Sequence, residues 1–176
     1  FQPSGRTSLA QGSWISGPFY SEGDFESTDS PLFAIAANIE KNDFHRTTSG
    51  NDLRDIVYGL DLVYKYKRVF ATGEYYWRER TPETGSTFKS NGFFAQATYL
   101  VNKAKTWEIG ARYGQFDPTD QLSSNLRKEL RAVLSYYYAE HRAKLQVDIG
   151  QLEDQAANGG SGSKNTELRV QTQLVF

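Results

Sequence analysis

The chain has no cysteine, no methionine and only two histidines among its 176 residues. Without cysteine, neither a disulfide framework nor a cysteine-ligated metal site can form. The chain does not begin with Met and shows no charged-then-apolar leader, so we expect it to be processed, truncated or one piece of a longer protein. It also shows no motif for a cofactor.

Long apolar runs and a net charge of one sign are missing as well. The 20 Lys and Arg residues nearly balance the 21 Asp and Glu residues, so charge gives no general attraction to nucleic acid. No stretch reaches the ~18 apolar residues that a membrane-spanning helix needs. A membrane β-barrel stays possible, because only every second residue of its strands faces lipid.

Aromatic residues are abundant: 11 Tyr, 11 Phe and 3 Trp are spread along the chain, which favours β structure. From residue 31 onward, apolar and polar residues alternate with the period of two that is typical of β-strands. Residues 1–30 are predicted to be irregular, holding one strand or a loop, and residues 31–176 to form one β domain. The alternation predicts eight strands, at 32–41, 56–66, 69–78, 92–101, 106–115, 129–138, 143–151 and 166–176.

The connections between these strands alternate in length. Long loops on one rim and tight turns on the other are typical of a transmembrane meander, with its turns on the periplasmic side. A soluble β-sandwich, the alternative, has no reason to sort its loops in this way. The expected long loops are 42–55, 79–91, 116–128 and 152–165, and the expected short turns are 67–68, 102–105 and 139–142.

Aromatic residues on the apolar faces gather near both strand ends, as they do at the two interfaces of a membrane. Beside the long loops they are Tyr58, Trp77, Phe93 and Tyr113. Beside the short turns and the C-terminus they are Tyr64, Tyr66, Tyr99, Trp107, Tyr136, Tyr138 and Phe176. The outward positions between these two girdles are aliphatic residues or glycine. The fold class predicted is therefore all-β, a transmembrane antiparallel up-and-down β-barrel.

Four runs of sequence carry a resemblance to a known family. They start at Asn91 (Asn-Gly-Phe-Phe-Ala-Gln-Ala-Thr-Tyr-Leu), Trp107 (Trp-Glu-Ile-Gly-Ala-Arg-Tyr-Gly-Gln-Phe-Asp-Pro), Ala143 (Ala-Lys-Leu-Gln-Val-Asp-Ile) and Leu168 (Leu-Arg-Val-Gln-Thr-Gln-Leu-Val-Phe). Together they resemble the C-terminal half of the phosphate-selective porin O/P-like family. The resemblance implies a larger barrel of about sixteen strands, a size that leaves an aqueous channel. The chain end also resembles the terminal strand of bacterial outer-membrane β-barrels, whose last aromatic residue is the signal for the barrel-assembly machinery. This resemblance implies that Phe176 has that role.

The inward positions carry charges of both signs. Basic residues alone would suggest an anion channel, but acidic residues are interleaved with them, and pairing across neighbouring strands is the simpler interpretation. Weak or no charge selectivity follows, and the inward glycines Gly110, Gly114 and Gly150 are expected to leave space. The predicted pore-lining residues are Lys65, Glu74, Arg78, Glu108, Arg112, Arg131, Lys144, Asp148 and Arg169.

The function predicted is an outer-membrane porin of the Gram-negative cell envelope that lets small polar solutes or anions diffuse through a water-filled barrel. Two alternatives stay open: a structural barrel that anchors or docks other envelope proteins, and a small barrel that these eight strands close by themselves. An enzyme is not expected, because the two histidines fall at opposite ends of this topology. The expected partners are outer-membrane lipid and lipopolysaccharide, the assembly machinery, and further copies in a homotrimer.

Overall fold

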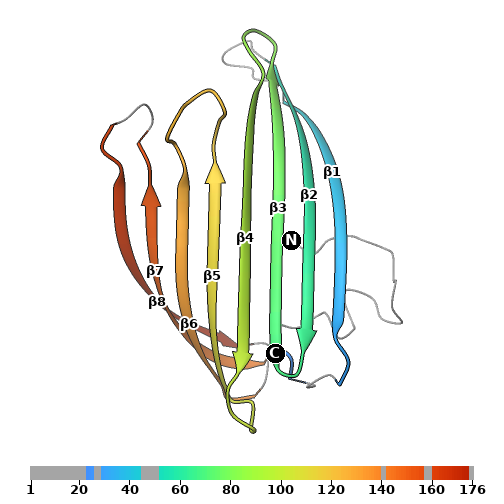
Figure 1. The fold of residues 1–176 in the computed structure, drawn as a ribbon, viewed down its shortest axis with the longest axis vertical. Coiled ribbons are helices and arrows are strands. Elements are labelled where there is room, and N and C mark those ends of the chain that lie inside the picture. Colours follow the sequence, from blue (N-terminus) through green and yellow to red (C-terminus); the bar gives the residue numbers. More distant parts are fainter. Residues whose placement is uncertain (1–22, 26–28, 45–51, 140–141, 157–159, 175–176) are drawn as a thin grey trace.

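The computed structural model describes residues 23–25, 29–44, 52–139, 142–156 and 160–174, and its regular structure is entirely β (Figure 1). No helix in this part of the chain is long and apolar enough to cross a membrane. The eight strands are β1 (Leu32–Phe44), β2 (Leu53–Tyr66), β3 (Val69–Pro82), β4 (Phe88–Leu100), β5 (Trp107–Asp117), β6 (Arg127–Tyr137), β7 (Ala143–Asp154) and β8 (Ser163–Leu174).

The strands form one antiparallel sheet in chain order, β1 to β8, so the predicted up-and-down meander is confirmed. Figure 1 shows the sheet as a curved wall. The wall is open: among the described residues β1 pairs only with β2, and β8 only with β7. The alternative of a small barrel closed by these eight strands is therefore wrong for this structure. Each edge strand keeps one row of backbone groups for a further strand.

The strands run further into the long loops than the sequence predicts. The ladder between β3 and β4 continues to Arg80 and Phe88, so their connection is only 83–87 instead of 79–91. The other three connections at this end are 45–52, 118–126 and 155–162. Apolar alternation is needed only where one face of a strand meets an apolar environment, whereas an antiparallel ladder can continue into water, so the pattern underestimates strand length. We call this end of the sheet the loop end.

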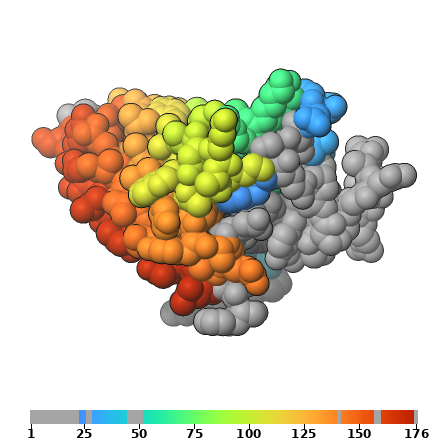
Figure 2. Space-filling view, turned by 90° about the horizontal axis from the view of Figure 1, so that it is seen from below, coloured from blue at the N-terminus to red at the C-terminus, as the bar shows by residue number. Residues whose placement is uncertain are grey.

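The opposite end of the sheet, the turn end, carries the short connections 67–68, 101–106 and 138–142, and Figure 2 views the molecule from this side. Lys67 and Arg68 form a two-residue turn between β2 and β3, with φ of 43° and 73°. Positive φ at both residues gives the turn the twist that a two-residue hairpin needs, at a conformational cost for non-glycine residues.

One face of the sheet is a continuous apolar surface. The registers place Ala97, Ala111 and Ala132 side by side, and Leu134, Val147 and Val170 in the next row toward the turn end. Large aliphatic residues of this face are exposed: Ile35 is 56% exposed and Ile149 is 54%. A sheet in water buries such a surface, so this face requires an apolar solvent.

Aromatic pairs flank the aliphatic band. Near the loop end Tyr58 stacks on Trp77, with ring centroids 5.4 Å apart, and Phe93 lies 5.8 Å from Tyr113. Near the turn end Trp107 and Tyr138 both contact Tyr136, each at 4.7 Å.

Cations sit beside the aromatic residues of the turn end. Lys67 Nζ lies 5.0 Å from the Tyr66 ring centroid, and the Arg68 guanidinium lies 5.3 Å from the Tyr99 ring centroid. A hydrogen bond with the Tyr66 side chain raises the pKa of Lys67. Phe176 and residues 1–22 lie outside the described residues, so their predicted roles stay predictions.

Candidate functional site

The polar face, opposite the apolar face, carries all nine residues predicted to line a pore. The registers align Asp61 with Glu74, Arg112 with Arg131 and Asp148 with Arg169 across neighbouring strands. Several of these polar side chains are nearly inaccessible even in the open sheet. A face on which charges are buried must compensate them locally, because an unpaired buried charge is costly.

Arg131 on β6 is the centre of a charge network that spans three strands. Its Nε donates to Glu129 Oε1 at 2.8 Å, its Nη2 to Glu167 Oε2 at 2.7 Å, and its Nη1 to Asp148 Oδ1. Arg169 Nε donates to the same Asp148 oxygen at 3.1 Å. The Arg131 and Asp148 side chains are only 6% and 5% exposed. Inward charges of neighbouring strands therefore pair here, as Arg131 does with Asp148.

Gly150 makes room for this network. A Cβ atom at Gly150 would lie 2.6 Å from Arg131 Cζ, which is closer than real Cβ contacts. A Cβ at Gly110 would lie 2.7 Å from Thr98 Cγ2 and 2.9 Å from Ala97 O. The expectation that these two glycines leave open space is therefore wrong, since neighbouring atoms occupy it. At Gly114 the nearest atom would be 3.6 Å away, an ordinary contact.

Gly150→Ala is expected to lower the free energy of unfolding by about 1–3 kcal/mol, the usual cost of overpacking. The added methyl group must displace the Arg131 guanidinium, which is held by three carboxylates. Gly114→Ala is the matched control, because its methyl group meets only ordinary contacts. Urea titration of the protein folded in lipid measures both variants, and equal losses would contradict the crowding at Gly150.

Two arginines of the polar face are not ion-paired with any described residue. The Arg112 guanidinium carbon lies 4.3 Å from the Phe94 ring centroid, a cation–π contact. Arg78 Nε donates to Ser90 Oγ at 3.0 Å. Arg112 is exposed, so its charge is available to solutes at this face. The predicted pore-lining set thus includes both compensated charges around Arg131 and two arginines that are not ion-paired with a described residue.

The structure adds a pair that the sequence pattern missed. At the loop end of the polar face, Arg80 donates two hydrogen bonds to Asp55, from Nε to Oδ1 at 2.6 Å and from Nη2 to Oδ2 at 2.5 Å. Asp55 is 4% exposed. Both residues fall in ranges that the pattern assigns to loops. Both residues continue the alternation of inward-facing positions on β2 and β3 beyond the apolar part of each strand. Extending that alternation is the signal that could have found them.

A row of buried residues crosses the polar face at the turn end. Its members are each no more than 7% exposed and form three register pairs, one in β2–β3, one in β4–β5 and one in β6–β7. We call it the turn-end row: Lys65, Phe70, Leu100, Glu108, Tyr137 and Lys144. Tyr137 donates its hydroxyl hydrogen to Glu108 Oε2, which joins β6 to β5. Phe70, Leu100 and Tyr137 are the buried apolar core of the described residues.

Next to this row, on the side toward the loop end, the polar face holds a cavity of about 250 Å³. Its lining combines the Arg131 network with amides and hydroxyls, among them Gln96, Gln146 and Ser135. Such groups hydrogen-bond water and neutral polar solutes as well as ions. The described residues contain no cluster of three or more His, Cys, Asp or Glu side chains that could hold a metal ion.

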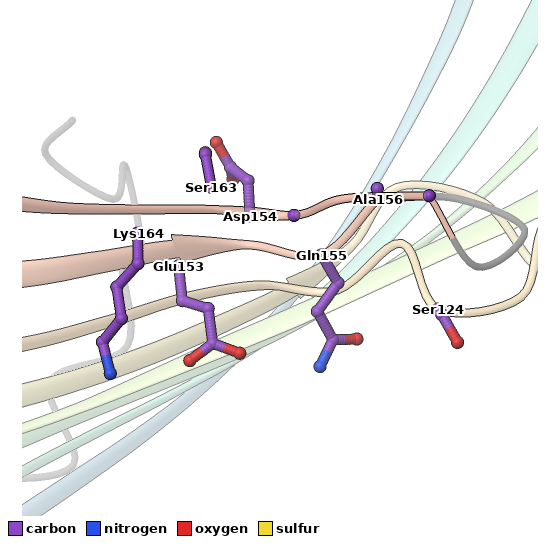
Figure 3. A pocket seen from close by; sticks show the side chains of 9 residues that line it. Ser124, Glu153, Asp154, Gln155, Ala156, Ser163 and Lys164 are labelled. Atoms are coloured by element: carbon purple, nitrogen blue, oxygen red, sulfur yellow. The ribbon is translucent and has the colours of Figure 1, made fainter.

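A larger cavity, of about 590 Å³, lies at the loop end beside the β7–β8 connection (Figure 3). Figure 3 shows Glu153, Gln155 and Lys164 directed to one side of the strands, and Asp154 to the other. Asp154 pairs with Arg127 at 3.7 Å, and both side chains are more than half exposed. This cavity therefore belongs to the solvated rim rather than to the polar face of the wall.

The two faces define a class of protein. An antiparallel wall with an aliphatic band between aromatic girdles on one face, and compensated charges on the other, forms a porin-type channel of the outer membrane. The family model described as "Phosphate-selective porin O and P" matches residues 33–176, well over half of the chain, so the chain belongs to this family.

Membership of this family places the protein in the bacterial outer membrane and indicates a channel rather than an enzyme. Neither the curated proteins nor the solved structures compared with the chain include a match.

Proposed function

We propose that this chain forms part of the wall of a water-filled pore through which small polar solutes diffuse passively, with little discrimination by charge. The observation that carries the proposal is the Arg131 network, in which buried charges on the polar face are paired with one another. Paired charges wet a wall and orient water without presenting a field of one sign to the solution.

The open edges of β1 and β8 support a wall rather than a complete small barrel. Further strands that continue the sheet from these edges would close it around a wider lumen, and barrels of about sixteen strands leave an aqueous channel. The exposed polar side chains of β8, including Arg169 and Glu167, would then face this lumen.

A preference for anions is the second candidate, and Arg112 and Arg78 favour it, because neither is ion-paired with a described residue. Two cations on a wall that also carries Glu74 give a weak positive bias rather than a continuous basic path. The proposal is therefore a general pore with at most a modest anion preference.

The full-length protein in a planar lipid bilayer is expected to form channels whose reversal potential in a KCl gradient stays close to zero. Its conductance should scale with that of the bathing salt, as expected for a wide aqueous pore. A strongly anion-selective reversal potential would instead favour an anion-specific site. If reconstituted protein that is verified to be folded shows no conductance, the proposed pore function is wrong. The alternative hypothesis of an anchoring barrel is then favoured.

A further inference from the structure

Three residues before β1, Gly23–Phe25, lie against the turn end of the polar face. Asp24 is 2% exposed, and its Oδ2 accepts a hydrogen bond from the Arg68 backbone N–H at 2.8 Å. Arg68 belongs to the turn between β2 and β3, 44 residues away in the chain. A buried carboxylate that accepts from a backbone N–H is a charge-assisted bond, stronger than one between neutral groups.

Phe25 gives the segment two further attachments. Its backbone oxygen accepts a hydrogen bond from Lys105 Nζ in the connection between β4 and β5. Its ring meets the Tyr137 ring edge-on, with centroids 4.8 Å apart and planes at 86°, an arrangement that aromatic pairs favour. Three residues thereby contact the β2–β3 turn, the β4–β5 connection and the end of β6.

The two residues that donate these hydrogen bonds, Arg68 and Lys105, both have a costly backbone conformation. Arg68 and Lys105 have φ of 73° and 55°, the left-handed region that non-glycine residues seldom adopt. Gly23 itself has φ of 72°, and a Cβ added there would lie 3.4 Å from Glu108 Oε1. The segment thus lies within contact range of the turn-end row and is hydrogen-bonded to both connections.

The location of these contacts matters for a pore. Glu108 and Tyr137 belong to the turn-end row on the polar face, so Gly23–Phe25 lies on the inner side of the wall. Seen from the turn end, the dark blue atoms of this segment lie next to the yellow-green β4–β5 connection (Figure 2). The buried core of the described residues is found at this level of the polar face and not nearer the loop end.

We propose that Gly23–Phe25 is an internal constriction element: it is clasped onto the inner wall at the turn end and narrows the mouth of the pore there. This inference rests on the proposed function, because narrowing has a consequence only if solutes pass. The Asp24–Arg68 bond is the clasp that holds the element, and Phe25 covers Tyr137. Loss of the clasp widens the mouth and exposes the turn-end row to water.

The test uses full-length protein carrying Asp24→Ala, with Asp120→Ala as the matched control. Asp120 Oδ1 accepts a backbone hydrogen bond from Lys89 at 2.9 Å, the same kind of bond at the opposite end of the sheet. Single-channel conductance is recorded in planar bilayers, and hydroxyl-radical labelling of Tyr137 is read by mass spectrometry. Asp24→Ala is expected to raise both the conductance and the labelling, and Asp120→Ala neither.

Unchanged conductance of a folded Asp24→Ala variant, or continued protection of Tyr137 in it, overturns the constriction element. If Asp24→Ala fails to insert, Phe25→Ala takes its place, since it removes the cover of Tyr137 and leaves the clasp. Absence of conductance in the wild-type protein contradicts the proposed pore instead. The Tyr137 labelling then decides by itself whether the segment covers the turn-end row.

Discussion

Val147→Arg is expected to weaken folding into a lipid bilayer by about 2–4 kcal/mol, the cost of an arginine facing lipid near the bilayer centre. Val147 lies in the aliphatic band, between Leu134 and Val170 in the strand registers. It is 37% exposed in the isolated sheet, so no packed core is disturbed. The whole effect therefore comes from the solvent that covers this face, and urea titration in lipid vesicles measures it.

The neighbouring substitution Gln146→Arg is the control. Gln146 precedes Val147 on the same strand and lines the cavity of the polar face. An arginine there meets water and carboxylates but also basic residues of the lining such as Lys144 and Arg169, so a loss of no more than about 1 kcal/mol is expected, well below that of Val147→Arg. Equal unfolding free energies for the two variants would mean that water covers both faces, and the membrane assignment of the apolar face would fail.

The contrast between these neighbours also explains what the sequence alone could predict. Side chains of a strand alternate strictly, so residues such as Val147 and Gln146 reveal their faces without any knowledge of the fold. Strand number, order and both aromatic girdles follow from that period together with the short turns. The charged residues named from it as pore-lining all lie on the polar face, although solute contact by them stays a prediction.

Other features depend on distances between side chains, which the two-residue alternation of a strand does not encode. The Asp55–Arg80 pair lies beyond the point where apolar alternation ends, because the ladder continues past the membrane edge. The sequence pattern predicts open space at Gly150, but the long Arg131 side chain of the neighbouring strand occupies it. Asp24 comes from a stretch with no alternation at all, so nothing in the sequence links it to Arg68.

Arg131→Gln is expected to lower the free energy of unfolding by about 3 kcal/mol, the lower end of the range for breaking a buried ion pair. The guanidinium serves Glu129, Asp148 and Glu167 together, and glutamine cannot replace its charge. The loss stays at the lower end because Arg169 still reaches Asp148 at 3.1 Å. Urea titration in lipid measures the stability.

The same substitution should shift the reversal potential of the pore toward cation selectivity, since carboxylates on the inner wall lose their partner. Arg112→Gln separates the two effects. It also removes a positive charge from the polar face, but Arg112 is exposed and not ion-paired with any described residue, so its stability change should stay within about 1 kcal/mol, the worth of its cation–π contact with Phe94. Both variants are thus expected to shift selectivity in one direction, while Arg131→Gln destabilises the wall far more. Equal stability of the two would show that the Arg131 network wets the wall without holding its strands together.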